Sequence, residues 1–555
     1  MNQKPKRDFL IPILLCVVGA IMFLPFLGRV HLFDWDEINF AECAREMVTA
    51  KQYFLVTINY LPFWEKPPLF IWMQALSMNL FGVSDYAARL PNAICGIATL
   101  LLLYHIGKSW KDKKFALLWV LAYVGSVLPH FYFKSGIIDP WFNFFIFTGI
   151  YFFARFRMQQ KDLLPGKPNY FIALSALFIG LAVMTKGPVA LLVFVISLLV
   201  YWFISKRKSV IKFKQAMLFV LVFLIAGGAW FIAAALTGHL DTLKSFVEYQ
   251  VRLFNTQDAG HGGPFYYHLP ILLIGCFPAS IFAIRGMLIS KNDDEKFNEA
   301  RRWMGILFWV VLILFSIVKT KIIHYSSLCY YPLAFFAAYA AYKLLYENYP
   351  WKKWMSWGLA ITGGLLAIAL AGLPIVAIHK QVILDSGIIK DPFASANFQA
   401  NVSWSLADCT MGIFLLLSII FSLVLVSKKK VMLGIVGIFL ATLITTNTIL
   451  IFSAPKIEQY TQQAPIDFYQ DLKGKDVYVT TLGFKSYSQY FYFEEQPWKD
   501  ARCTDNDWLL NGAIDKSAYF VTKINKAEEF EKGYPQLKEL YRKNGFVFLQ
   551  RVNNK

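Results

Sequence analysis

The residues best suited to chemistry in this sequence are acids and bases that stand beside long apolar segments. In chain order they are Asp36, Glu65, Lys66, Asp139, Lys186, Arg252, His261, Lys319, Lys321 and Tyr325. Ionisable side chains next to apolar, membrane-like segments are costly and usually functional. The pattern therefore predicts that these residues, although far apart in sequence, contribute to one site.

The residue types in this set indicate group transfer. A carboxylate such as Asp36 or Asp139 can act as a general base toward an acceptor hydroxyl. Lysine and arginine side chains can stabilise a phosphate leaving group. The sequence has no P-loop and no GxGxxG motif, so a soluble nucleotide donor or nucleotide cofactor is not expected. Together these features predict sugar transfer from a polyprenyl phosphate.

The composition indicates that lipid surrounds most of the chain. Of the 555 residues, 57% are hydrophobic and only 16% are charged, whereas soluble domains carry roughly 25% charged residues. The formal net charge of +19 is assigned to basic loops that orient a membrane protein, and no nucleic-acid partner is expected. The seven cysteines show no disulfide framework and no CxxC spacing.

About thirteen apolar runs are long enough to cross a bilayer. They lie near 9–27, 86–107, 115–133, 140–156, 169–185, 188–205, 215–237, 268–289, 303–318, 327–345, 354–378, 409–427 and 431–452. If the N-terminus is cytoplasmic, the loops on its side carry most of the lysines and arginines, as the positive-inside rule requires. The sequence thus predicts a mainly α, polytopic membrane protein of about thirteen helices whose C-terminus is extracytoplasmic.

Four segments on the predicted outer side are long. Within the loop 28–85, the apolar run 69–82 is too short to span and suits an interfacial or re-entrant helix. The loop 238–267 is the expected active-site loop, and 379–408 forms a third. The residues 453–555 contain strand-like runs at 477–481, 489–493, 518–522 and 547–552, with a helical stretch over 525–544. They predict a small α/β domain after a membrane domain that covers 1–452.

Six motifs between residues 30 and 335 resemble one family. The segment DEINFAECAREM at 36–47 is similar to D-E-x-x-[YF]-A-E-x-x-R-E-M of the aminoarabinose lipid A transferases (ArnT-like), which are relatives of the protein mannosyltransferases within the GT-C glycosyltransferases. The other matches, in order, are FWEKPP at 63–68, IDP at 138–140, VMTKG at 183–187, RLF at 252–254 with HGGPFY at 261–266, and KTKIIHY at 319–325. Beyond about residue 340 only the topology is shared.

The resemblance implies a role for each motif residue. Asp36 is expected to be the leading catalytic acid, with Asp139 as its partner. Lys66, Arg252 and Tyr325 are expected near the donor phosphate, and Glu65 and His261 match positions that bind a divalent metal ion (Mg, Mn or Zn). The family often has an arginine after the equivalent of His261, where this chain has glycines. Two alternatives follow: the phosphate contact of this arginine is missing in this chain, or Lys319 or Lys321 supplies it.

Each assignment has a simpler alternative. Asp36 and Asp139 can cap helices, and Pro140 suits the first helical position. Asp34 is expected to be a solvated loop acid, and Glu37 a cap for the helix through 42–45. Lys186 can extend along the membrane surface. His324 is expected to be structural or solvated.

The sequence predicts an inverting polyprenyl-phosphate-dependent glycosyltransferase in the bacterial inner membrane, with its site on the periplasmic face. Lipid A, another envelope glycan and the Ser or Thr of a secreted protein all remain open as acceptors. A lipid-linked sugar flippase or transporter is the alternative, but it predicts mid-membrane charges and repeated halves, which the sequence lacks. A non-catalytic scaffold gives no reason for acids and bases on several separate loops.

Overall fold

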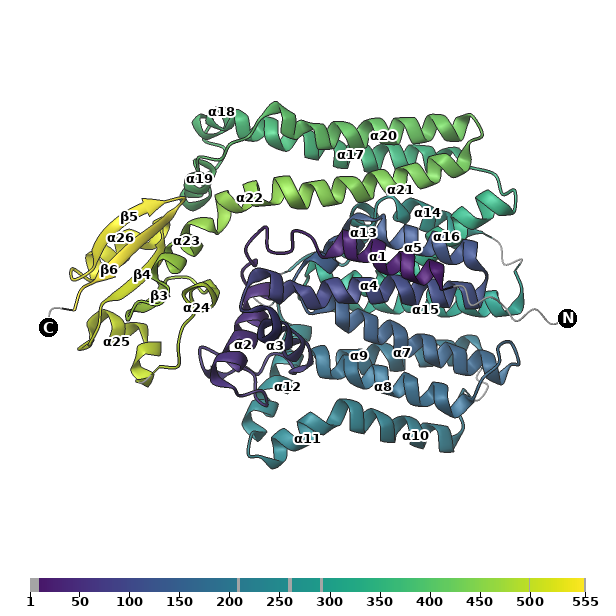
Figure 1. The fold of residues 1–555 in the computed structure, drawn as a ribbon, viewed down its shortest axis with the longest axis horizontal. Coiled ribbons are helices and arrows are strands. Elements are labelled where there is room, and N and C mark those ends of the chain that lie inside the picture. The colour runs from purple at the N-terminus through teal and green to yellow at the C-terminus, as the bar shows by residue number, and fades with distance from the viewer. Residues whose placement is uncertain (1–8, 207–209, 258–261, 290–292, 499, 554–555) are drawn as a thin grey trace.

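The computed structural model describes residues 9–206, 210–257, 262–289, 293–498 and 500–553 as a helical bundle with a small sheet at one end (Figure 1). The bundle helices run along the long axis of the molecule. They are α1 (Leu10–Phe23), α4 (Asp85–Trp110), α5 (Lys113–Val124), α6 (Val127–Phe131), α7 (Asp139–Gln160), α8 (Pro168–Lys186), α9 (Val189–Ile204), α10 (Phe213–Phe223), α11 (Ala229–Leu236), α13 (His268–Gly275), α14 (Ala279–Leu288), α15 (Glu295–Ile317), α16 (Tyr330–Tyr346), α17 (Lys353–Ile378), α20 (Thr410–Ser427) and α21 (Val431–Thr448).

The expectation of a polytopic helical membrane protein is confirmed. Every predicted span coincides with one of these helices or with a consecutive pair. In the described part of the chain, eight helical segments are long and apolar enough to cross a membrane, or ten if the bent pairs α5–α6 (81°) and α13–α14 (110°) each count as one span. α1 and α9 are shorter apolar helices and α7 does not meet the criterion, so this count stays below thirteen.

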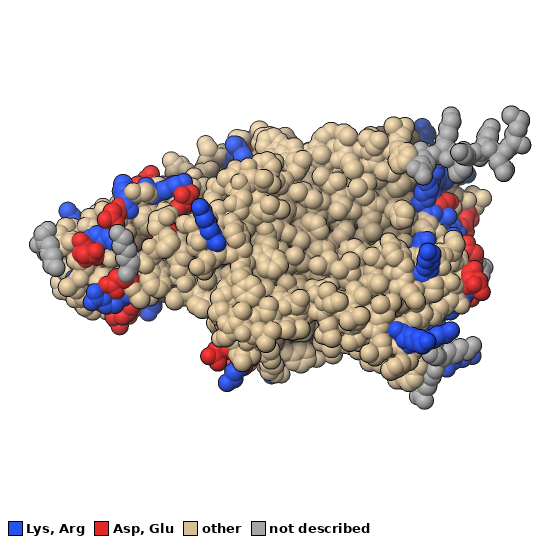
Figure 2. Space-filling model, turned by 60° about the horizontal axis from the view of Figure 1, so that its bottom comes forward, with Lys and Arg blue, Asp and Glu red and all other residues tan. Residues whose placement is uncertain are grey.

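The charged side chains separate toward the ends of the molecule. Figure 2 shows Lys, Arg, Asp and Glu gathered at both ends of the long axis, with a belt of other residues between them. The start of α1 lies toward the end of the molecule opposite the C-terminal sheet (Figure 1). Because uncharged side chains can face lipid, this belt is the part of the surface suited to the bilayer.

A layer of short elements covers the bundle at the end near the sheet (Figure 1). They are α2 (Asp36–Ala50), β1 (Thr57–Ile58), β2 (Leu61–Pro62), α3 (Leu69–Phe81), α12 (Leu240–Asn255), α18 (Lys380–Asp385) and α19 (Pro392–Phe398). The run 69–82 is indeed a short helix, α3, of 13 residues. Its apolar residues pack against α2 and α4 at the end of the bundle.

The C-terminal region forms the expected α/β unit, with three differences from the sequence prediction. Its elements are α22 (Ala454–Thr461), α23 (Gln463–Leu472), β3 (Tyr478–Leu482), α24 (Ser488–Phe493), α25 (Asn506–Asn511), β4 (Ala518–Lys523), α26 (Ile524–Gly533), β5 (Lys538–Lys543) and β6 (Phe546–Arg551). The strand order is β3-β4-β6-β5, with β3 and β4 parallel and the other pairs antiparallel.

The predicted strand 489–493 is wrong, because this aromatic run is helix α24. A short apolar run has no clear period, so burial against neighbours decides its conformation. The predicted helix 525–544 is correct only for α26, since its second half forms the exposed edge strand β5 paired with β6. The expected boundary at 453 falls inside a continuous helix over 431–461.

One apolar cluster joins the outer layer to the C-terminal unit. It contains Ile38 and Met47 of α2, Ile71 of α3, Phe491 of α24 and Phe548 of β6, all buried. Burial of such side chains contributes about 1.5–3 kcal/mol each. The C-terminal unit is therefore packed onto the segments that carry the candidate site.

Candidate active site

A cavity of about 510 Å³ lies at the end of the bundle that faces the C-terminal unit. Its walls come from α2, the loop 63–68, the start of α7, the end of α8, α9, α12 and the segment 315–328. The ionisable residues that line it are Asp34, Asp36, Glu65, Lys66, Asp139, Lys186, Tyr249, His324 and Tyr325. The structure thus brings together most of the residues that the sequence analysis selected, although their catalytic roles stay predictions.

The two leading acids stand at helix N-termini. Asp36 begins α2 and Asp139 begins α7, where Pro140 occupies the first turn as expected. The partial positive charge at a helix N-terminus favours a carboxylate at these positions. Asp36 is 48% exposed, whereas Asp139 is 4% exposed and lies 2.7 Å from the Nζ atom of Lys186. Asp36 is thus the acid that a substrate can reach, and Asp139 is the one held inside.

The predicted phosphate contacts converge on the ring of Tyr249. The Nζ atom of Lys66 lies 4.9 Å from the ring centroid, and the guanidinium of Arg252 lies 5.1 Å from it. Lys66 is also 3.9 Å from Glu65. Burial, and after it the nearby charge of Lys186, lowers the pKa of Lys66, although Glu65 opposes the shift. A phosphate would add a second counter-charge, beside that of Glu65, to this buried cation.

The two lysines of the run 319–321 lie outside the cavity lining. The Nζ atom of Lys321 donates hydrogen bonds of 3.0, 2.6 and 2.6 Å to the carbonyls of Phe315, Ser316 and Val318. Lys321 therefore caps the C-terminal end of α15, and its assignment to the donor phosphate does not fit this geometry. Lys319 is exposed beyond the cavity wall.

Lys186 and His324 both line the cavity, although a membrane-surface position was the simpler alternative for Lys186 and His324 was expected to be structural or solvated. Lys186 ends α8 and pairs with Asp139. The Nε2 atom of His324 is 3.7 Å from Asp36 Oδ2 and 3.8 Å from Asp139 Oδ2. The motifs VMTKG and KTKIIHY, which contain these two residues, were the only sequence features that could have indicated their place in the site. The type of one residue does not show whether its side chain lies in a cavity or in solvent.

The binding of a divalent metal ion by Glu65 and His261 stays a prediction. Glu65 lines the cavity, while His261 lies outside the described residues. Within the ranges that the structure describes, no group of three or more His, Cys, Asp and Glu side chains could hold a metal. Lys66 at 3.9 Å also competes for the Glu65 carboxylate.

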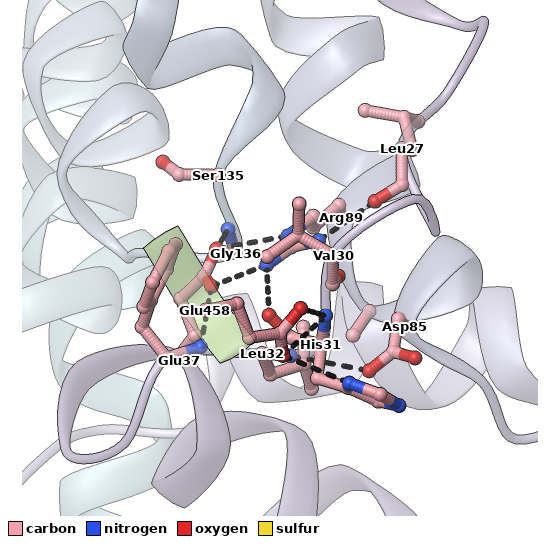
Figure 3. Close-up of polar contacts among 12 residues, drawn as sticks. Leu27, Val30, His31, Leu32, Glu37, Asp85, Arg89, Ser135, Gly136 and Glu458 are labelled. Carbon is pink, nitrogen blue, oxygen red and sulfur yellow. Dashed lines mark hydrogen bonds and ion pairs between the residues drawn. The ribbon is translucent and has the colours of Figure 1, made fainter. Parts of the chain in front are cut away.

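A buried ion pair between Arg89 and Glu37 connects the segments that carry the two leading acids, and Figure 3 shows its contacts. Arg89 of α4 pairs with Glu37 at 2.7 and 3.0 Å, and both side chains are buried. Glu37 follows Asp36 directly, and its carboxylate also accepts the N–H of Gly136, three residues before Asp139. Arg89 donates further hydrogen bonds to the carbonyls of Leu27, Val30 and His31. Glu37 is therefore more than a helix cap, because it ties α2 to the start of α7.

The outer rim of the cavity is tied to the C-terminal unit. Asp34 was expected to be solvated, but its Oδ1 atom accepts the N–H of Trp35 at 2.9 Å and of Tyr487 at 3.2 Å. Trp35 has φ 78° and ψ −90°, a conformation that costs a non-glycine residue about 1–3 kcal/mol. Lys485 lies 5.2 Å above its ring. The expectation for Asp34 is thus wrong, because a long-range partner supplies hydrogen-bond donors.

Comparisons with known proteins agree with this architecture. Residues 65–231 match the family described as dolichyl-phosphate-mannose-protein mannosyltransferase. The chain is similar to the undecaprenyl phosphate-alpha-4-amino-4-deoxy-L-arabinose arabinosyl transferases of Pectobacterium atrosepticum, at 27% identity over 73% of this chain and 74% of the relative, and of Edwardsiella ictaluri, at 29% over 69% and 67%.

Among solved structures, ArnT from Cupriavidus metallidurans bound to undecaprenyl phosphate matches with a TM-score of 0.77 at 16% identity, covering 99% of both chains. The Archaeoglobus fulgidus oligosaccharyltransferase matches with a TM-score of 0.51 at 10% identity, covering 94% of this chain and 70% of that one. These likenesses establish the fold.

The bundle, the acid-lined cavity at its end and these relatives define a multi-pass membrane glycosyltransferase of the GT-C class. Within that class the chain is similar to the ArnT-like transferases and to the protein mannosyltransferases. The family resemblance of the six motifs is thereby confirmed. The relatives give no support to a flippase.

Proposed function

We propose that this protein transfers a sugar from a polyprenyl-phosphate donor to an acceptor at the periplasmic face of the bacterial inner membrane. The observation that carries the proposal is the single cavity in which carboxylates, cations and an apolar wall meet. The relatives, an undecaprenyl-phosphate sugar transferase and a dolichyl-phosphate mannosyltransferase family, support the same donor class.

The apolar wall of the cavity suits the lipid part of the donor. Val189, Leu192 and Val193 of α9 line the cavity, and Ile196 and Val200 line a neighbouring cavity of about 630 Å³. Residues spaced by three or four positions lie on one face of a helix. On α15 the second cavity extends from Ile317 to Arg301. Both cavities lie along α9 and α15, and we propose that together they hold the lipid chain of the donor; we call them the prenyl trough.

The proposed reaction inverts the anomeric carbon of the sugar. Asp36 takes the proton of the acceptor hydroxyl, and the acceptor oxygen forms a bond to the anomeric carbon. The bond from that carbon to the phosphate oxygen breaks, and its electron pair leaves with the prenyl phosphate. Lys66 and Arg252 stabilise the phosphate charge, with Tyr325 beside it. Asp139, paired with Lys186, lies beside the reacting groups.

A divalent ion held by Glu65 and His261 would add positive charge near the phosphate. The steps described for Asp36, Lys66 and Arg252 do not depend on it. The acceptor class stays open between lipid A, another envelope glycan and a protein hydroxyl. The periplasmic position of the cavity follows the positive-inside pattern of the basic loops.

Transfer of labelled sugar from undecaprenyl-phosphate donors by the purified full-length protein in lipid nanodiscs tests the proposal. We expect Asp36→Asn to lower turnover by about 10²–10⁴-fold, because it removes the general base. Asp241→Asn, at an exposed acid on α12, is the matched control and should keep normal turnover. Movement of intact donor across a liposome bilayer without sugar transfer would instead favour a flippase.

A further inference from the structure

His324 lies between two of the acids that line the cavity, Asp36 and Asp139. It belongs to the 3₁₀ helix Ile323–Cys329, and its side chain is 12% exposed. Its Nε2 atom is nearly equidistant from Asp36 Oδ2, at 3.7 Å, and Asp139 Oδ2, at 3.8 Å. One ring nitrogen thus faces two carboxylates that come from different helices.

The two oxygens of Asp139 differ in their surroundings. Oδ1 lies 2.7 Å from Lys186 Nζ, whereas Oδ2 is buried and has no hydrogen-bond partner in the described part of the chain. A buried carboxylate oxygen without a donor is costly. A shift of about 1 Å would bring His324 Nε2 within hydrogen-bonding distance of either acid. His324 can therefore donate a hydrogen bond from Nε2 to the carboxylate of either Asp36 or Asp139.

We infer that His324 is a positioning residue for sugar transfer, whose Nε2–H group is shared by Asp36 and Asp139 and holds these like-charged carboxylates side by side. The inference rests on the proposed function and deepens it. It gives Asp139 and His324 a joint role, in which both act through Asp36 rather than on the substrate.

The shared N–H group of His324 acts during the sugar-transfer step. The acceptor hydroxyl proton moves to Asp36 Oδ2 while the acceptor oxygen bonds to the anomeric carbon and the bond from that carbon to the phosphate breaks. His324 neither gains nor loses a proton. Once Asp36 is neutral, the N–H group can pair fully with Asp139 Oδ2, which has no other donor. This exchange stabilises the state in which Asp36 has accepted the proton.

The charged groups around His324 set the pH behaviour of this arrangement. Asp36 comes from α2, Asp139 from α7, Lys186 from the end of α8 and Lys66 from the loop 63–68. His268 of α13 is a further titratable group near His324, and the ring of Tyr325 lies beside the His324 imidazole. Without the N–H donor, two carboxylates face each other, and like charges at close range favour binding a proton.

Two substitutions of His324 distinguish the effect of losing its N–H hydrogen-bond donor from the effect of losing its imidazole ring. In the nanodisc transfer assay, His324→Ala should lower kcat about 100-fold and change the donor KM less than about threefold, because the geometry of the base is lost. The acid limb of its pH–kcat profile should move to higher pH. His324→Gln keeps an N–H donor, so it should recover kcat to within about tenfold of the wild type. His379→Gln, an exposed histidine between α17 and α18, should match the wild type throughout.

Thermal unfolding of the same proteins gives a readout that needs no turnover. His324→Ala should lower the apparent melting temperature, and adding Asp139→Asn should restore part of the loss by removing one of the facing charges. An unchanged kcat and acid limb in His324→Ala, or equal losses in the Ala and Gln variants, would overturn the inference while leaving the proposed function intact. If the wild type transfers no sugar, the proposed function fails. The melting temperatures then test the role of His324 alone. If Asp139→Asn does not restore stability to the His324→Ala variant, the inference about His324 is wrong.

Discussion

At the scale of single residues, the site contains buried charged side chains whose pKa values depend on burial and on the neighbouring charges. Lys66 is the clearest example, since burial disfavours its ammonium and Glu65 only partly offsets this. Below its lowered pKa the buried charge reduces the stability of the fold, and this cost is relieved as the pH rises. A bound phosphate would favour the charged form again.

The lowered pKa of Lys66 predicts an alkaline limit to donor use. kcat/KM for the donor should fall as the pH rises through a value below the ordinary lysine pKa of about 10.5, because the neutral amine no longer attracts phosphate. Lys66→Arg stays charged in that range, so its activity should decline at higher pH than that of the wild type. Steady-state kinetics against pH measures this. Lys390→Arg, at an exposed lysine between α18 and α19, should leave the profile unchanged.

At the scale of elements, two ion pairs connect segments that are far apart in sequence. Arg89 and Glu37 fix the start of α2 against the loop before α7. His31 binds Glu458 of α22 at 2.8 Å and so ties the entry to α2 to the C-terminal unit (Figure 3). The site is therefore held by contacts between elements and not by any one helix.

Breaking the Arg89–Glu37 pair should destabilise the protein strongly. Arg89→Met leaves the Glu37 carboxylate buried without its main partner, which costs about 3–5 kcal/mol. The double variant Arg89→Met, Glu37→Gln should recover part of that loss because no uncompensated charge remains. Thermal unfolding and sugar transfer measure the two effects. If the single and double variants unfold alike, the pair is not what orders this region.

The His31–Glu458 pair predicts that stability depends on pH. Burial lowers the pKa of His31, but the hydrogen bond to Glu458 and the charges of Glu458, Asp85 and Asp467 outweigh it, and the net pKa is raised above 6.5. The stabilisation is complete below the unfolded value and is lost as the pH rises through the folded value. The melting temperature should fall across this interval in the wild type and change less in His31→Gln, with His379→Gln behaving like the wild type.

At the scale of the whole molecule, the site lies where three structures meet. The bundle supplies the prenyl trough, the outer layer supplies Asp36 and Lys66, and the C-terminal unit closes the rim through Tyr487 and Lys485. The elements that carry these residues lie together at one end of the molecule (Figure 1). A lipid-linked donor can then keep its chain in the membrane while its sugar reaches the acids.

The prenyl trough predicts that a bulky residue blocks long donors. Ile196→Trp fills the trough on α9, so KM should rise at least about tenfold for a long-chain polyprenyl-phosphate sugar, because filling a packed apolar space forces displacement. A short-chain analogue that does not reach Ile196 should be used normally. Val195→Trp changes the neighbouring position, which is 41% exposed, and is the control. Equal effects of the two substitutions would place the lipid chain elsewhere.

The sequence alone determined the helices and the list of candidate acids. Apolar runs of membrane length form helices because the backbone must bond internally in lipid. Asp36 and Asp139 were predictable because their motifs and their places at helix starts are local features. The family resemblance extended this to Lys66, Arg252 and Tyr325.

Only the tertiary structure decided which side chains face one another. It directs Lys321 to carbonyls at the end of α15, places His324 between two acids, and turns 489–493 into a helix. It also gives Asp34 a partner in the C-terminal unit 453 residues away. The physical reason is that these outcomes depend on burial and on hydrogen-bond partners from distant segments, and neither periodicity nor motif spacing contains that information.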